Sequence, residues 1–116
     1  MAARITLTQV EDLFLQMRHQ PALKGGGPLL WGYFFTDQDA AKLRPLAKYL
    51  ESTGYRLVEI NPTDGTTFFL HVEKVELHTA ASLHERNTSF YGLAERFGVE
   101  SYDGMDVGPA EPATEK

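Results

Sequence analysis

The stretch YRLVEINPTDGTTFFLHVEKVELH, residues 55–78, decides the fold. Two runs rich in β-branched and aromatic residues, 55–60 and 67–78, flank a polar segment that contains Asp64-Gly65. Such runs are typical of strands, and an Asp-Gly pair between them is a strong signal for a hairpin. We therefore predict two antiparallel strands, adjacent in the sheet, at the centre of the chain.

Upstream of this hairpin, the sequence predicts a buried strand and a helix. The aromatic run LLWGYFFT, residues 29–36, has the length of a strand and is apolar on both faces, which favours a central position in the sheet. Apolar residues at helical spacing follow it as far as Gly54, which we expect to end this helix. A further helix is predicted at about residues 9–19, because Thr8 can begin a capping box there.

Downstream of the hairpin, the sequence predicts a third helix and a last strand. Thr79 can cap a helix of about residues 80–97, and Gly98 can end it. Residues 99–107 then form a short strand or an extended segment. The complete order of elements is α-β-α-β-β-α-β.

Without its first helix, this order is that of the ferredoxin-like folds. We predict an α+β fold, a ferredoxin-like βαββαβ sandwich with a four-stranded antiparallel sheet and an extra N-terminal helix. Right-handed crossovers place the first and third strands at the centre and two helices on one face. The extra helix could cover part of the other face. We expect residues 1–108 to form a single domain and residues 109–116 a flexible tail.

Composition excludes several classes of function. The chain has 116 residues, a net charge of −5 and no cysteine, so thiolate nucleophiles and cysteine-ligated metals are absent. Its lysines and arginines are scattered, whereas proteins that grip phosphates usually show a basic stripe, so we expect no direct binding to nucleic acid. No apolar run approaches the ~20 residues of a membrane span, and the start lacks the features of a signal peptide. We predict a cytoplasmic protein that does not contact membranes.

A cluster of histidines and glutamates in residues 70–87 raises the alternative of an enzyme or metal site. His71 and Glu73 share one face of the predicted strand. The segment HERNT resembles the zinc-binding helix pattern H-E-x-x-H, but Thr88 takes the place of the second histidine. We assign no catalytic residue, metal or cofactor. The alternative is a small metal-binding protein or hydrolase that uses four side chains, His71, Glu73, His84 and Asp103.

The segment LAERFGVESYDG, residues 93–104, resembles the regulator of ribonuclease E activity B (RraB) family, also called ribonuclease E inhibitor B. LWGYFF at 30–35 and FFLHVEKVELHT at 68–79 are similar to proteins of the same bacterial family, and the resemblance covers most of residues 5–108. It implies an α+β sandwich of ferredoxin-like type and a non-enzymatic regulator of RNA degradation. The resemblance thus implies the role of the family members of the enteric type, which bind the non-catalytic part of ribonuclease E and restrain RNA cleavage.

The resemblance and the acidic charge together predict a protein partner, ribonuclease E or another basic protein. We expect the partner to meet acidic contacts and aromatic anchors, namely Glu73, Glu76, Asp103 and Asp106 with Trp31 and Tyr33. We expect a structural role for residues that tie the third helix to the YDG segment, namely Arg86 and Asn87 with Tyr102 and Gly104.

Overall fold

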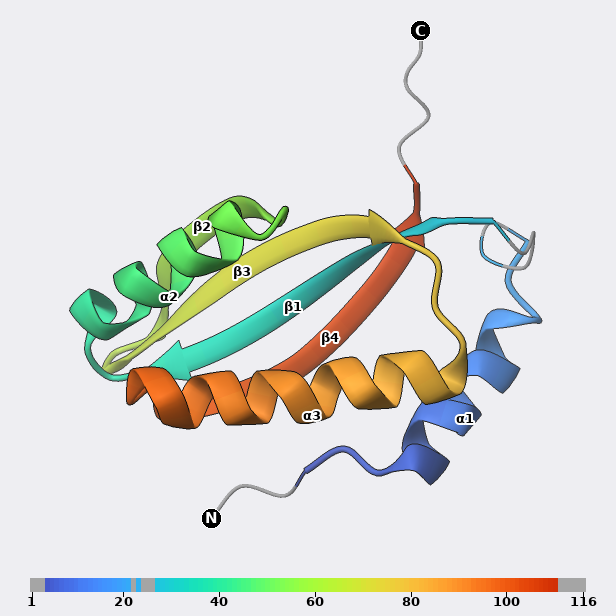
Figure 1. Ribbon diagram of the computed structural model, residues 1–116, viewed down its shortest axis with the longest axis horizontal. Coiled ribbons are helices and arrows are strands. Elements are labelled where there is room, and N and C mark those ends of the chain that lie inside the picture. Colours follow the sequence, from blue (N-terminus) through green and yellow to red (C-terminus); the bar gives the residue numbers. More distant parts are fainter. Residues whose placement is uncertain (1–3, 22, 24–26, 111–116) are drawn as a thin grey trace, which may run out of the picture.

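The computed structural model describes residues 4–21, 23 and 27–110. The elements, in chain order, are α1 (Leu7–Met17), β1 (Leu29–Asp37), α2 (Ala40–Ser52), β2 (Arg56–Asp64), β3 (Thr67–Glu76), α3 (Ala80–Phe97) and β4 (Ser101–Pro109). The strands form one sheet in the order β2-β3-β1-β4, and every neighbouring pair is antiparallel (Figure 1). This confirms the predicted βαββαβ order, the four-stranded antiparallel sheet and the extra N-terminal helix.

The central hairpin forms as predicted, but its turn lies one residue later. Asp64 still pairs with Thr67 in the ladder between β2 and β3. The two-residue loop is therefore Gly65-Thr66, whereas the sequence suggested Asp64-Gly65. The backbone pairing of Asp64 extends β2 beyond the predicted end at Ile60.

The core lies between the sheet and the helices, and alternate residues of β1 fill it. Trp31, Tyr33 and Phe35 are at most 1% exposed. Phe90 of α3 packs against two of these rings, with centroids 5.0 Å from Tyr33 and 5.3 Å from Phe35. Burying a large apolar side chain contributes about 1.5–3 kcal/mol, so this one strand anchors much of the fold.

Helix α3 has the predicted bounds because both of its ends are capped by local sequence. The Thr79 hydroxyl accepts a hydrogen bond from the Ser82 amide at 3.1 Å, and the Ser82 hydroxyl accepts one from the Thr79 amide at 2.9 Å. Gly98 ends the helix in the left-handed conformation, with φ of 69°. Such a φ favours glycine, which has no Cβ to clash with the backbone.

Helix α1 begins earlier than predicted. Its N-cap is Thr6, whose hydroxyl accepts from the Gln9 amide at 3.1 Å, while the Gln9 side chain accepts from the Thr6 amide at 2.8 Å. The capping box therefore starts at Thr6 and not at Thr8. The segment before the helix is also held in place, because the Ile5 amide donates to the Tyr91 hydroxyl of α3 at 2.8 Å.

The prediction that α1 could cover part of the second face of the sheet is wrong. Helix α1 packs beside the N-terminal half of α3, on the side of the sheet that α2 and α3 cover (Figure 1). The ring of Phe14 stacks on Trp31 with centroids 6.0 Å apart. Because Trp31 points into the core, this contact holds α1 on the helix side. The opposite face of the sheet carries no helix in the described part of the chain.

The last strand reaches the boundary of the predicted tail. Pro109 is the final residue of β4 and pairs with Leu29. Of the tail predicted at 109–116, residues 111–116 lie outside the described residues. Among the helices that are described, none is long and apolar enough to cross a membrane.

A buried hydrogen bond joins α3 to β4 and can be tested by a single-atom change. The Tyr102 hydroxyl donates to the Asn87 side-chain oxygen at 2.6 Å, and Asn87 is fully buried. Tyr102→Phe leaves that oxygen without its donor, so we expect the free energy of unfolding to fall by about 1–3 kcal/mol in urea denaturation.

Tyr49→Phe is the matched control for this change. Tyr49 is only partly buried, and it packs against Phe97 through its ring. Loss of its hydroxyl should change the free energy of unfolding by less than about 0.5 kcal/mol. Equal effects of the two substitutions would contradict a specific role for the bond between Tyr102 and Asn87.

Candidate functional site

A polar network lies inside the protein, where the end of β3 meets α3. Oε2 of Glu76 accepts hydrogen bonds from the Tyr33 hydroxyl at 2.7 Å and from Nη1 of Arg86 at 2.6 Å. Nε2 of His78 lies 3.1 Å from the Tyr33 hydroxyl and 3.4 Å from the same carboxylate oxygen. Ser82 contacts the other ring nitrogen of His78 at 2.9 Å. The network therefore engages one carboxylate oxygen from several directions.

The electrostatics of this network favour an ionised Glu76 and a neutral Tyr33. Burial by itself raises the pKa of the Glu76 carboxyl. Hydrogen bonds from His78, Arg86 and Tyr33, together with the charge of Arg86, outweigh burial and lower this pKa from 4.5 to about 2. Burial raises the pKa of the Tyr33 hydroxyl far above its ordinary value, and the Glu76 carboxylate raises it further. Tyr33 is thus held as a hydrogen-bond donor to Glu76.

The network corrects the expected role of Arg86. We predicted that Arg86 and Asn87 would bind the YDG segment, and only Asn87 does so, through Tyr102. Arg86 points instead to Glu76, and its guanidinium carbon lies 5.5 Å from the ring centroid of Tyr55. Arg86 pairs with Glu76 because a buried carboxylate without a counterion is costly, whereas the YDG segment carries no such buried charge for Arg86 to neutralise.

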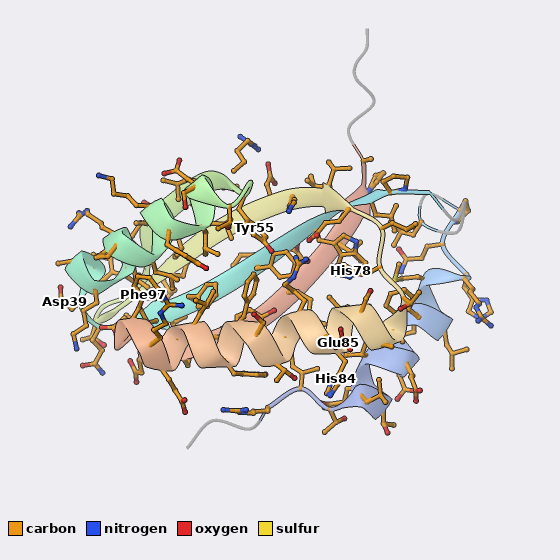
Figure 2. The ribbon with its side chains drawn as sticks, in the orientation of Figure 1. Asp39, Tyr55, His78, His84, Glu85 and Phe97 are labelled. Atoms are coloured by element: carbon orange, nitrogen blue, oxygen red, sulfur yellow. The ribbon has the colours of Figure 1, made fainter. Side chains whose placement is uncertain are left out.

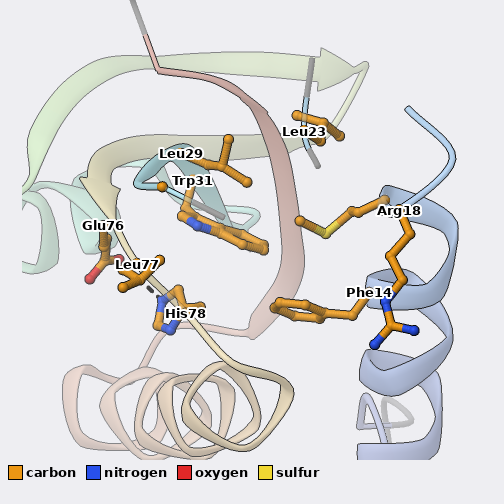
Figure 3. Close-up of a pocket in the computed structure, with 10 residues that line it drawn as sticks. Phe14, Arg18, Leu23, Leu29, Trp31, Glu76, Leu77 and His78 are labelled. Carbon is orange, nitrogen blue, oxygen red and sulfur yellow. Dashed lines mark ion pairs between the residues drawn. The ribbon is translucent and has the colours of Figure 1, made fainter. Parts of the chain in front are cut away.

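A cavity of about 220 Å³ separates α1 from the ends of β1 and β3 (Figure 3). Its walls are largely apolar and include Phe14, Met17 and Leu23 on one side and Trp31 and Leu77 on the other. Nε1 of Trp31 is buried and has no hydrogen-bond partner among the residues that the structure describes. The cavity opens on the helix side of the sheet, so it is separate from the uncovered face.

The uncovered face of the sheet carries several of the predicted contact residues. Side chains alternate along a strand, so Gly32 and Phe34 point away from the core that Trp31 enters. The strand registers align one row of residues across all four strands, in the order Arg56, Glu73, Gly32 and Asp106. Within this row, Arg56 pairs with Glu73. The row thus contains an internal ion pair and a second carboxylate, two strands away.

Gly32 leaves room above the sheet for two polar side chains, those of Asp106 and His71. A Cβ on Gly32 would lie 2.5 Å from Oδ1 of Asp106 and 2.8 Å from Nε2 of His71. The ring of His71 also stacks on Phe34, with centroids 4.4 Å apart and an interplanar angle of 23°. Phe69 adds a third ring, 6.3 Å from Phe34. This arrangement joins a partly exposed aromatic surface to an exposed carboxylate.

The two predicted aromatic anchors, Trp31 and Tyr33, do not lie on the uncovered face. Trp31 and Tyr33 are at most 1% exposed and lie in the core, so neither presents a surface to a partner. Phe34 and Phe69 are the half-buried aromatics of the uncovered face. The alternation of β1 carried this signal, because placing Trp31 inside requires Phe34 to lie outside.

The acidic residues that we predicted as contacts fall into two groups. Glu76 belongs to the interior network and is almost buried, so the structure corrects its place as a surface contact. Glu73 lies on the uncovered face but is largely buried beneath its ion pair with Arg56. Asp103 and Asp106 are exposed on β4, at the edge of the sheet. Two of the four acidic residues are thus freely accessible.

The four side chains of the alternative metal or hydrolase site do not converge. His71 and Glu73 lie on the uncovered face, whereas His84 projects from α3 towards α1 on the other side of the sheet (Figure 2). Asp103 stands at the register shift of β4 opposite Phe34 and Phe35. In the described residues, no group of three or more histidine, aspartate or glutamate side chains could hold a metal ion. The four side chains therefore do not form the single site that this alternative requires.

Fold and sequence together place the chain in a family. The fold is that of an open-faced α+β sandwich with βαββαβ topology. The family model described as Regulator of ribonuclease activity B, RraB, matches residues 22–107, which is more than half of the chain. The chain therefore belongs to the RraB family, a family of regulators of ribonuclease activity. The region matched by the family model begins after α1. A search of curated proteins found no match to the chain.

The interior network predicts a pH-dependent stability. The folded pKa of Glu76 is about 2, below its ordinary value of 4.5, so its stabilising effect is complete above 4.5 and is lost as pH falls towards 2. At 1.36 kcal/mol for each pKa unit, Glu76→Gln should lower the free energy of unfolding by about 3 kcal/mol at pH 7. In urea denaturation, the difference in free energy of unfolding between wild type and Glu76→Gln should shrink as the pH is lowered from 7 to 3.

Glu85→Gln provides the control on the exposed side of α3. A surface substitution of this kind should change stability by less than about 0.5 kcal/mol at either pH. If the gap between wild type and Glu76→Gln stayed constant over this pH range, the ionised carboxylate would not be the stabilising species.

Proposed function

We propose that this protein is a non-enzymatic cytoplasmic regulator that binds a basic protein partner and thereby restrains RNA cleavage. The partner is ribonuclease E, through its non-catalytic part, or another basic protein. The observation that carries this proposal is the uncovered sheet face, where half-buried aromatic rings and His71 lie near the exposed carboxylate of Asp106. Asp103 is exposed on the same edge strand. Partly exposed aromatics supply binding energy, and the carboxylates select a basic partner.

Family membership and charge support this proposal. The RraB family regulates ribonuclease activity, which implies a protein partner. The chain carries a net charge of −5, so a basic partner would be attracted before contact. Asp103 and Asp106 form no ion pair with any described residue and remain available to such a partner.

The arrangement of the polar groups supports a binding function over catalysis. The most strongly shifted carboxyl group, that of Glu76, is engaged by Arg86 and Tyr33 and is stabilised as a carboxylate. A general acid or base at neutral pH needs a pKa near 7, far from the value of about 2 for this group. We therefore assign the network to stability and the uncovered face to the partner.

The proposal is tested with purified ribonuclease E from the source organism and a labelled RNA substrate. The wild-type protein should bind the enzyme and slow cleavage several-fold at equimolar concentration. It should have no effect on a catalytic fragment that lacks the non-catalytic part. The double variant Asp103→Asn/Asp106→Asn should bind at least tenfold more weakly, because basic side chains of the partner then lose the carboxylates with which they pair.

A second double variant separates local contacts from overall charge. Glu11→Gln/Asp12→Asn also changes the net charge from −5 to −3, but on the exposed side of α1, outside the family match. It should retain wild-type binding and inhibition. Undiminished cleavage in the presence of wild-type protein, together with no binding to ribonuclease E, would refute this partner. Equal losses in both double variants would refute the assigned face.

A further inference from the structure

The uncovered face contains one satisfied carboxylate and one unsatisfied carboxylate in the same row. Arg56 reaches from β2 to Glu73 on β3, and its side chain is 72% exposed, so the pair lies at the surface. Asp106 occupies the corresponding position on β4, across Gly32. No side-chain hydrogen bond or ion pair joins the carboxylate of Asp106 to any residue within 4–21, 23 or 27–110.

The surroundings of Asp106 suit a planar cation. Nε2 of His71 and Oδ1 of Asp106 both lie close to the position of a Cβ on Gly32. The ring of His71 stacks on Phe34, which remains partly exposed. On β4, the residue paired with Phe34 is Gly104, which has no side chain. A guanidinium can lie against an aromatic face while it donates two parallel hydrogen bonds to a carboxylate.

We propose that Asp106, Phe34 and His71 form a recognition site for an arginine side chain of the partner. The guanidinium binds the Asp106 carboxylate and stacks on the rings of Phe34 and His71. This ion pair with the partner would resemble the ion pair that Arg56 forms with Glu73 within the chain. This inference rests on the proposed function and makes it more specific, because it selects arginine over lysine. A lysine ammonium is a point charge that cannot stack or bind the carboxylate through two parallel donors.

Gly32 makes this site possible. Its missing side chain leaves room for Oδ1 of Asp106 and Nε2 of His71 to extend over β1. An added Cβ would approach both atoms within 3 Å and force the two side chains apart. These atoms are the far ends of side chains at the surface, so the strand itself can keep its course. Gly32→Ala therefore alters the geometry of the site without changing its charge.

The test compares two synthetic peptides that differ only in the cation. Each has twelve residues, with four arginines or four lysines spaced by glycine and serine. Binding to the full chain is followed by calorimetry and by backbone amide NMR shifts. We expect the arginine peptide to bind at least fivefold more tightly, with the largest shifts in β1 and β4. Asp106→Asn should abolish this preference, and Gly32→Ala should reduce it while the NMR spectrum remains that of a folded protein.

Asp12→Asn removes one charge from the exposed surface of α1 and should leave the preference for arginine unchanged. Phe34→Leu keeps an apolar side chain but removes the ring, so it should bring the arginine peptide close to the lysine peptide. Equal affinity of both peptides for the wild-type protein would overturn the arginine site, as would failure of the arginine peptide to bind at millimolar concentration. Either result leaves the ribonuclease assay as a separate test of the proposed function.

Discussion

Tyr33 is the residue on which the interior depends, because it serves two kinds of contact at once. Its ring packs edge-on against Phe90, with centroids 5.0 Å apart, and so joins β1 to α3. Its hydroxyl donates to Glu76 at the end of β3, where Arg86 of α3 meets the same carboxylate. The apolar core and the polar network are thus connected through one side chain. A largely buried charge is tolerated here because Tyr33 donates a hydrogen bond to it and Arg86 supplies a cation.

The order of the elements could be predicted from the sequence because their signals are local. Thr79 and Gly98 cap α3 through contacts with immediate neighbours, and the continuous apolar run of β1 favours a central strand. The hairpin was predicted for the same reason, although backbone pairing of Asp64 moved its turn by one residue. Local chemistry thus determined where the elements lie in the chain and which strands are central.

Features that depend on contacts between distant residues could not be predicted in this way. The apolar side of α1 would suit either face of the sheet, and long-range contacts such as the packing of Phe14 on Trp31 decide between them. The pairing of Arg86 with Glu76 depends on how α3 crosses the end of β3, which no sequence spacing reveals. The proximity of Asp106 to His71 likewise depends on strand register and on the small size of Gly32.

The contact between Phe14 and Trp31 bears on where the N-terminal boundary of the folded domain is drawn. The family match starts at residue 22, so a boundary drawn there would remove the helix that covers one side of the indole. Trp31 is the single tryptophan of the chain. Its emission therefore reports, without any added label, whether α1 is docked or has left the ring open to water. An optical signal of this kind would follow the attachment of α1 independently of any binding on the uncovered face.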